Sequence, residues 1–356
     1  MNKIVVFGIN HKTAPIEIRE KFFLNPPQQD LLLSELKSNP AVLEAFVLST
    51  CNRTEVYLHT TATPGNMESI IRLISQLKKI ELSEQFHRHF YFYENENAVR
   101  HLLRVTSGLD SLVLGEKQII GQVKTSVERA RARMMFGSYF NILSNIAIRT
   151  AKKAQNETEI SYGGSSISWA AITMAENILG TLEEKSILII GAGKMGELTL
   201  DQLKNKGVKN IYLMNRTGEA AQALAETCQG IAVSLLDLKE TLSEVDVCIC
   251  SAGAPHFILD KKTIEKVMML RNNRRLVLID ISMPRNIDPQ AGALDQVVLS
   301  HIDHLHMVVG ENMRKRQAAV TLVEEIIDRK LTAFYEKINK LENQSPDLYS
   351  ESLKTL

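Results

Sequence analysis

Strand-type and helix-type runs of apolar residues divide the chain into three regions. In residues 1–157, short apolar runs such as "KIVVFGI" and "EVYLH" are mixed with segments whose apolar residues recur at helical spacing, among them "QQDLLLSELKSN". The segment "NETEISYGGSSIS", rich in Gly, Ser and Thr, has the composition of a linker into a second domain. We therefore predict an N-terminal α/β domain over residues 1–157.

Residues 158–305 show a different pattern, in which continuous apolar strands alternate with helical segments. The strands are "SILIIGAG", "NIYLMNRT", "VDVCICSAG" and "RLVLIDIS". Fully apolar strands separated by helices are typical of a parallel sheet that is covered on both faces. This pattern predicts a second α/β domain of the Rossmann type.

Residues 306–356 are predicted to form a long spine helix followed by a short polar tail, "NQSPDLYSESLKTL". Seven apolar residues are spaced 3, 4, 4, 3, 4 and 3 apart, as on one face of a helix. We expect part of this stripe to pack against the chain's own domains and the rest to support a weak homodimer. The stripe consists of Val320, Val323, Ile327, Leu331, Phe334, Ile338 and Leu341.

Composition and charge narrow the class of protein. The 356 residues carry a formal net charge of +1, so an anionic partner must be met by a local patch. No apolar stretch approaches the roughly 18 residues that span a bilayer, and four cysteines without a CxxC pair fit a reduced compartment. We expect a cytoplasmic enzyme with no membrane segment and no metal site.

A glycine motif follows the first strand of the second domain directly. The motif G-x-G-x-x-G after a strand and before a helix allows a tight turn, close approach of a pyrophosphate and close packing of the helix. The alternative is an ordinary glycine-rich turn. The motif comprises Gly191, Ala192, Gly193, Lys194, Met195 and Gly196.

The end of the next strand indicates which dinucleotide binds. An enzyme that reads NAD usually ends this strand with Asp or Glu, which binds the ribose 2′-hydroxyl. Here the strand is followed by Asn215, Arg216 and Thr217, and a cation with no carboxylate suits a 2′-phosphate. We predict NADPH, with Arg216 as a solvated surface charge the alternative reading.

Cys51 lies in a polar turn between two strand-type runs, in "VLSTCNRTEVYL". A free cysteine is more often a small buried hydrophobe, as we expect for Cys228, Cys248 and Cys250. Cys51 instead neighbours hydrogen-bonding residues, and Arg53 could stabilise its thiolate. A nucleophilic thiolate together with a hydride carrier predicts formation of a thioester that is reduced to an aldehyde.

The segment "SGLDSLVLGEKQIIGQVK" fits neither helical nor strand periodicity, because Asp110, Ser111, Glu116, Gln118 and Gln122 interrupt its apolar run. Half-buried polar groups must be paired, so these residues form an internal network or meet a polar ligand. His101 lies just upstream on a predicted helix. As a lone histidine it would more often be structural than catalytic.

In chain order, these segments resemble the glutamyl-tRNA reductase family, up to about residue 340. The blocks that carry the resemblance are "GINHKTAP", "LSTCNRTEVY", "SGLDSLVLGEKQIIGQVK", "GAGKMGEL", "NRT" and "DISMPRNIDP". The resemblance implies NADPH-dependent reduction of glutamyl-tRNA(Glu) to glutamate-1-semialdehyde with release of tRNA, the first step of tetrapyrrole synthesis by the five-carbon route. It suggests channelling of the product to glutamate-1-semialdehyde aminomutase. Family members usually carry a longer C-terminal dimerisation domain, so we expect a truncated dimerisation region here.

The resemblance also implies roles for individual residues. Cys51 would be the nucleophile and His101 an activity-critical histidine, and Arg53 could hold a substrate carboxylate in a bidentate contact that distinguishes glutamate from its amide. The remaining members of the implied glutamate-recognition set are Thr50, Asn52, Ser111, Glu116, Lys117, Gln118 and Gln122.

A tRNA substrate needs a positive surface on this nearly neutral chain. Between Gln122 and Lys153 there are seven basic residues and one acidic residue, a local charge of +6. This patch is equally compatible with a surface that contacts phosphates and with a solvated helix face. The alternatives to a reductase are an inactive tRNA-binding homologue and an NADPH dehydrogenase of the shikimate dehydrogenase type.

Overall fold

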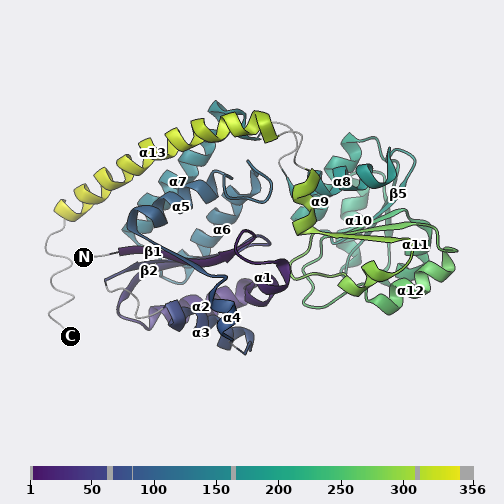
Figure 1. Ribbon diagram of the computed structural model, residues 1–356, viewed down its shortest axis with the longest axis horizontal. Coiled ribbons are helices and arrows are strands. Elements are labelled where there is room, and N and C mark those ends of the chain that lie inside the picture. Colours follow the sequence, from purple (N-terminus) through teal and green to yellow (C-terminus); the bar gives the residue numbers. More distant parts are fainter. Residues whose placement is uncertain (1–2, 62–66, 82, 162–165, 309–312, 345–356) are drawn as a thin grey trace. The chain divides into compact units, whose positions relative to one another are not determined.

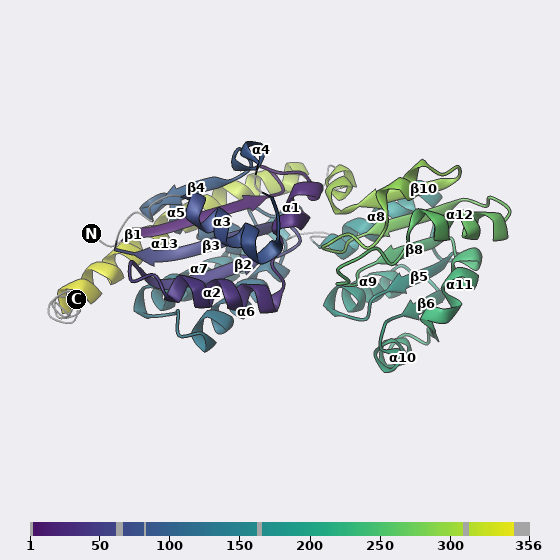
Figure 2. The same ribbon diagram turned by 90° about the horizontal axis from the view of Figure 1, so that it is seen from below.

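The computed structural model describes residues 3–61, 67–81, 83–161, 166–308 and 313–344. It consists of two compact units, the first formed by residues 1–163 together with 312–356 and the second by residues 164–311 (Figures 1 and 2). The long C-terminal helix, which the sequence pattern set apart, therefore belongs with the first unit. Within the predicted linker, residues 156–168, only residues 162–165 lie outside the described part, as does the polar tail from residue 345 onward.

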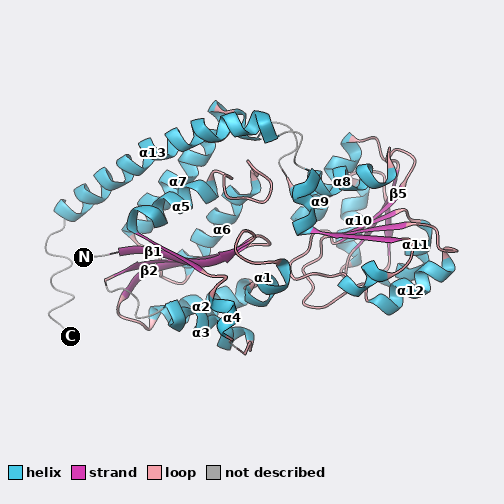
Figure 3. Cartoon of the chain, viewed as in Figure 1, coloured by secondary structure: helices cyan, strands magenta, loops and turns pink. Residues whose placement is uncertain are grey.

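The first unit is built on a four-stranded antiparallel sheet of order β2-β3-β1-β4. Figure 3 shows helices on both faces of this sheet, with α1 to α4 on one face and α5 to α7 on the other. The elements in chain order are β1 (Lys3–Asn10), α1 (Ile16–Phe22), α2 (Pro26–Lys37), β2 (Val42–Ser49), β3 (Arg53–Thr60), α3 (Met67–Lys78), α4 (Glu84–His87), β4 (Tyr91–Glu94), α5 (Asn95–Thr106), α6 (Gln118–Ala132), α7 (Ser138–Glu157), η1 (Glu159–Ser161) and α13 (Met313–Gln344).

Helix α13 covers α5 and α7 and completes the core of the first unit. The predicted stripe lies on its inner face. Five of the seven residues are at most 6% exposed, and Val320 and Leu341 at its ends are partly buried against the same core. The helix thus uses most of the stripe within its own unit, and only Val320 and Leu341 stay partly exposed.

The second unit is a doubly wound domain with a six-stranded parallel sheet of order β10-β9-β8-β5-β6-β7. Its first strand, β5, lies in the middle, so the strand order reverses between β5 and β8. The elements are α8 (Ile167–Leu179), β5 (Ser186–Ile190), α9 (Lys194–Asn205), β6 (Asn210–Met214), α10 (Gly218–Glu226), β7 (Ile231–Val233), η2 (Leu235–Asp237), α11 (Leu238–Glu244), β8 (Val247–Cys250), α12 (Lys261–Leu270), β9 (Leu276–Asp280), η3 (Pro289–Ala293), β10 (Val297–His301) and η4 (Ile302–Val308).

The strands on both sides of this reversal point are apolar along most of their length, because both faces of the sheet are buried. Residues of β5, β8 and β9 pack with α11 and α12 in one core, which includes Cys248 and Cys250 at 0% exposure. The prediction that these two cysteines are small buried hydrophobic residues is confirmed. In such sheets the ligand site lies beyond the carboxyl ends of the strands at the reversal point. In the part of the chain that the structure describes, no helix is both long and apolar enough to cross a membrane.

Candidate active site

The glycine loop after β5 has the geometry that a bound pyrophosphate requires. Gly191 adopts φ +112°, and a Cβ there would lie 2.8 Å from the main-chain nitrogen of Ala252. A Cβ on Gly196 would lie 2.0 Å from the carbonyl oxygen of Gly191, so helix α9 can approach the loop only without a side chain. At Gly193, which caps α9, a Cβ would meet nothing within 4 Å. The loop therefore turns tightly, packs closely and leaves open space at the helix N-terminus, where an anion is favoured.

A cavity of about 690 Å³ opens beside this loop, a volume within the range of small-molecule sites. It is formed by the loop after β5, the end of β6 and the loop after β8. Of the predicted cofactor residues, Lys194, Met195 and Gly196 do not line it, and Lys194 instead pairs with Glu197 at 2.9 Å. The predicted residues that do line it are Gly191, Ala192, Gly193, Asn215, Arg216 and Thr217.

The residues that follow β6 connect two parts of the cavity wall by hydrogen bonds, and one of them, Arg216, carries a positive charge. Asn215 Oδ1 accepts from the main-chain N–H of Ala192 at 3.4 Å, and Asn215 Nδ2 donates to the carbonyl of Thr217 at 3.2 Å. Arg216 is exposed, and among the described residues its guanidinium has no ion-pair partner. The loop after β8, residues 251–258, forms much of the remaining lining, together with Leu235 and Leu238, and was not singled out from the sequence. Its only signal was a small-residue sequence, "SAG", directly after an apolar parallel strand.

In the first unit, Cys51 lies at the tip of the hairpin between β2 and β3, as the alternation of strand and polar residues predicted. The turn is closed by a hydrogen bond from Thr50 N to the carbonyl of Arg53 at 2.8 Å, and Asn52 N donates to Thr50 Oγ1 at 3.2 Å. The N–H of His11 donates to the carbonyl of Asn52 at 3.0 Å, which holds the loop after β1 against the turn. The sulfur is thereby fixed at the end of a rigid hairpin.

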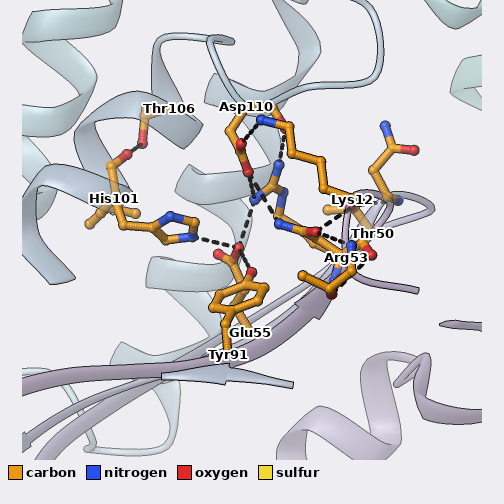
Figure 4. Close-up of polar contacts among 12 residues, drawn as sticks. Lys12, Thr50, Arg53, Glu55, Tyr91, His101, Thr106 and Asp110 are labelled. Atoms are coloured by element: carbon orange, nitrogen blue, oxygen red, sulfur yellow. Dashed lines mark hydrogen bonds and ion pairs between the residues drawn. The ribbon is translucent and has the colours of Figure 1, made fainter. Parts of the chain in front are cut away.

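The guanidinium of Arg53 contacts a buried group of carboxylates (Figure 4). Its Nη1 donates to Glu55 Oε1 at 2.6 Å and to Asp110 Oδ2 at 3.1 Å, and its Nη2 donates to the carbonyl of Asp110. Arg53 is 2% exposed and Glu55 0%. Both terminal nitrogens of Arg53 are bound to internal acceptors, so holding a substrate carboxylate, which stays a prediction, would require one of these partners to be exchanged.

Glu55 is the centre of this group, which we call the Glu55 cluster and define as Arg53, Glu55, Tyr57, Tyr91 and His101. Oε1 of Glu55 accepts from the Tyr91 hydroxyl at 2.5 Å and lies 2.9 Å from His101 Nε2, and Oε2 accepts from the Tyr57 hydroxyl at 2.6 Å. Burial alone would raise the pKa of Glu55, but Arg53 and the donors lower that pKa well below its usual value. His101, on α5 as predicted, is thus held by its Nε2 atom.

The thiol of Cys51 is neutral in these surroundings. Burial and, after it, the charge of Glu116 raise the pKa of Cys51 to about 12, whereas Arg19 and Arg53 lower it by less. Arg53 thus favours the thiolate, as predicted, but by less than burial and Glu116 oppose it. A nucleophilic Cys51 needs a group that removes its proton as it reacts.

The segment of mixed periodicity is a loop, residues 107–117, that leads into α6. Gly108 and Gly115 have φ of +75° and +79°, and a Cβ on Gly115 would lie 1.9 Å from the carbonyl oxygen of Ile160, so the loop is tightly packed. Ser111 and Glu116 are buried in it, Lys117 is exposed, and Gln118 and Gln122 are half-buried on one face of α6. Burial raises the pKa of Glu116 to about 7, against a smaller lowering by Arg53. Among the described residues the carboxylate of Glu116 has no ion-pair partner.

Two residues at the end of β1 and in the loop after it also join this site, and the sequence did not indicate a role for them. Asn10 Nδ2 donates to Asp110 Oδ2 at 3.3 Å, and Lys12 forms an ion pair with Asp110. They belong to the conspicuous block "GINHKTAP", but their partner lies about a hundred residues further along the chain, and no local pattern indicates that pairing.

The basic patch on α6 and α7 is partly neutralised. Arg129 and Arg133 both pair with Asp30 at 2.9 Å, Arg131 donates to Asn141, and Lys153 pairs with Glu157. The exposed basic residues of the patch without an ion-pair partner among the described residues are Lys124, Arg131, Arg149 and Lys152.

The doubly wound sheet and the cavity at its glycine loop define a nicotinamide-dependent oxidoreductase. The family model "Glutamyl-tRNAGlu reductase, N-terminal domain" matches residues 7–158, and the model "Shikimate / quinate 5-dehydrogenase" matches residues 173–308. Because curated relatives are about 40% identical to it along nearly its whole length, the chain belongs to the glutamyl-tRNA reductase family. The shikimate dehydrogenase alternative accounts for the second unit only.

Individual relatives give the extent of the match. The glutamyl-tRNA reductase of Thermodesulfovibrio yellowstonii is 40% identical over 96% of this chain and 81% of its own length, and that of Bacillus subtilis is 39% identical over 95% and 74%. The solved structure of glutamyl-tRNA reductase from Methanopyrus kandleri matches with a TM-score of 0.54 and 31% identity, over 96% of this chain and 82% of that one.

Proposed function

We propose that this chain reduces glutamyl-tRNA(Glu) to glutamate-1-semialdehyde with NADPH, releasing tRNA through a thioester on Cys51, as the first step of tetrapyrrole synthesis. The observation that carries the proposal is the position of Cys51. A cysteine stands at the tip of a rigid hairpin, beside buried ionisable groups, in the unit that matches the reductase N-terminal domain. The partner is charged tRNA, and the compartment that fits free thiols is the cytoplasm.

The first half of the reaction needs a proton acceptor for Cys51. Glu116 suits this role, because it is buried, has no ion-pair partner among the described residues, and its charge acts on the thiol. The thiol proton passes to the Glu116 carboxylate while sulfur attacks the carbonyl carbon of the ester. The carbon–oxygen bond to the ribose then breaks, and Glu116 returns the proton to the ribose oxygen. A buried carboxylate would repel the substrate's own carboxylate, so Glu116 fits proton transfer better than glutamate recognition.

In the second half, bound NADPH supplies the hydride that converts the thioester to the aldehyde and leaves Cys51 as a thiolate. The glycine loop would hold its pyrophosphate and Arg216 its 2′-phosphate. His101 would support the reaction indirectly, by holding the Glu55 cluster in place. Thr50, Asn52, Ser111, Gln118 and Gln122 remain proposed substrate contacts, and Arg53 could join them only by exchanging Asp110 for the substrate carboxylate.

The two further proposed partners, an aminomutase and a second copy of this chain, are supported by different observations. Transfer of the reactive aldehyde to an aminomutase remains a proposal that follows from the product's chemistry. A weak homodimer through α13 also remains a proposal, with little apolar surface to support it, because most of the stripe is covered within the first unit.

The function is tested with purified protein, glutamyl-tRNA and NADPH, followed by detection of the aldehyde. Wild type should form aldehyde, and without NADPH it should slowly hydrolyse glutamyl-tRNA through the thioester. Cys51→Ser should lose both activities while still binding NADPH, because a hydroxyl is a far poorer nucleophile than a thiolate. Cys228→Ser, at a cysteine outside the site, is the matched control. Aldehyde formation by Cys51→Ser would refute the mechanism, and tRNA binding without any aldehyde from wild type would favour the inactive homologue.

A further inference from the structure

The loop after β9, residues 281–288, is organised by a single buried carboxylate at the strand's end. Asp280 is 1% exposed. Its Oδ1 accepts from the main-chain N–H of Ser282 at 3.0 Å, and its Oδ2 accepts from Asn286 at 2.7 Å and Ile287 at 2.8 Å. The loop therefore returns on itself and places Asn286 at a fixed point next to the end of the strand.

Asn286 in turn holds the neighbouring loop, the one that follows β8. The side chain is 0% exposed, and its Nδ2 donates to the carbonyl oxygens of Ala254 at 2.8 Å and His256 at 3.1 Å. Its main-chain oxygen accepts from Ile258 at 2.7 Å and Leu259 at 3.0 Å. One residue thus makes four hydrogen bonds that fix both ends of the segment 254–259.

That segment is part of the cavity wall. Residues 251–258 line the same cavity as Gly191, Gly193 and Arg216, whereas Asn286 itself does not line it. In a doubly wound sheet the dinucleotide crevice lies between the loops that follow the two strands at the reversal point, here β5 and β8. The β5 side is shaped by the glycines. The loop on the β8 side is held in place by hydrogen bonds from Asn286, which belongs to the loop after β9.

We propose that Asn286 is a positioning residue for the cofactor, which fixes the β8 side of the cavity without touching the ligand, and that Asp280 fixes Asn286. The residue type follows from the geometry. Two carbonyl oxygens need two N–H donors on one short side chain, which an amide provides and a carboxylate does not. The inference rests on the proposal that this cavity binds NADPH.

The test is NADPH binding, followed by its fluorescence on titration with the intact protein. Asn286→Asp replaces both donors by acceptors that face two carbonyls, and should raise the Kd for NADPH about tenfold or more. Asn286→Ser, which keeps one donor, should give a smaller rise and serves if the Asp variant does not fold. Asn205→Asp, an exposed position in the same unit, is the matched control and should leave the Kd unchanged.

A second measurement separates positioning from general damage. Both Asn286 variants should retain the NADPH-independent hydrolysis of glutamyl-tRNA, and their KM for NADPH should rise while the KM for glutamyl-tRNA does not. NADPH binding by Asn286→Asp as tight as in wild type, or unfolding of both variants, would overturn the role of Asn286. If wild type itself binds no NADPH, the cofactor proposal is wrong and this inference falls with it.

Discussion

The Glu55 cluster illustrates how a buried charge is made tolerable at the level of single residues. A carboxylate with 0% exposure is unfavourable unless it is paired and hydrogen-bonded. Glu55 meets both conditions, with one guanidinium and three further side-chain partners. Glu116 belongs to the same loop as Asp110 but has no ion-pair or hydrogen-bond partner for its side chain among the described residues, and its pKa moves in the opposite direction.

This contrast leads to a prediction for Glu116→Gln. The folded-state pKa of Glu116, about 7, lies above its ordinary value of 4.5, so folding favours the protonated form. The wild type should therefore lose stability as the pH rises from 4.5 to 7, by up to about 3 kcal/mol, and glutamine should not. The stability of Glu116→Gln relative to wild type, measured by urea unfolding, should rise between pH 5 and pH 8.

The control for this prediction is Glu94→Gln at a half-exposed position paired with Lys3. Its stability difference from wild type should stay nearly constant over the same pH range. A constant difference for Glu116→Gln as well would mean that its carboxylate is not held in a desolvated site.

The predicted preference for NADPH over NADH depends on a single residue, Arg216. Arg216→Ala removes the exposed cation at the cavity and should weaken NADPH binding more than NADH binding, because only NADPH carries the 2′-phosphate. The measurement is the ratio of kcat/KM for the two cofactors, with Arg275→Ala, outside the cavity lining, as the control. An unchanged ratio would assign the phosphate to other residues.

At the scale of elements, α13 shows what a periodic pattern can and cannot predict. The stripe was predicted correctly, since apolar residues at helical spacing must be covered. Its partner was not, because spacing along one helix says nothing of which surface covers it. Arg100 pairs with Asp328 at 2.5 Å and Arg104 with Glu324, so the helix is fixed on α5 by contacts between residues more than two hundred positions apart.

The same reasoning applies to the candidate site. The hairpin around Cys51, the glycine loop and the parallel sheet of the second unit follow from local patterns along the chain and could be predicted. The partners of Arg53 could not, because Asp110 lies 57 residues away and a charged residue in a strand gives no sign of its ion pair. The loop 251–258 was missed for a related reason, as it is fixed by Asn286 of another loop.

The packing of α13 is tested by Phe334→Ala. Phe334 is 0% exposed in the core of the first unit, and its removal should cost about 3–5 kcal/mol of unfolding free energy in that unit. Leu322→Ala, on the same helix at 48% exposure, should cost about 0.5 kcal/mol or less. Urea unfolding followed by far-UV circular dichroism measures both.

The only tryptophan of the chain, Trp169, lies in α8 of the second unit and provides an internal reference. Its fluorescence transition should stay in place in Phe334→Ala. Equal costs for Phe334→Ala and Leu322→Ala would show that α13 does not complete the core.

At the scale of the whole molecule, the net charge of +1 requires any tRNA contact to be local. Arg149 and Lys152 are exposed, one turn apart on α7, and are not neutralised by described residues. Replacing both by Ala should weaken tRNA binding and lower the slope of log K against log salt by about 2, since each phosphate contact contributes about 1. Binding is measured by filter retention at several salt concentrations.

Arg72→Ala is the control, because Arg72 is exposed on α3 of the opposite sheet face and paired with Glu68. A slope unchanged in the double variant would identify the patch as a solvated helix face.

The second unit is inserted into the first, because the chain leaves the first unit at residue 163 and returns to it at residue 312. During synthesis, the sheet and helices α1 to α7 emerge first, but their core is completed only by α13. The ribosome needs roughly 10–30 s to add the intervening residues, at the usual rate of translation. Over that time the apolar surfaces of α5 and α7 have no cover, while the inserted unit can already fold by itself. The order of translation thus leaves an apolar surface of the nascent first unit uncovered until its last helix is made.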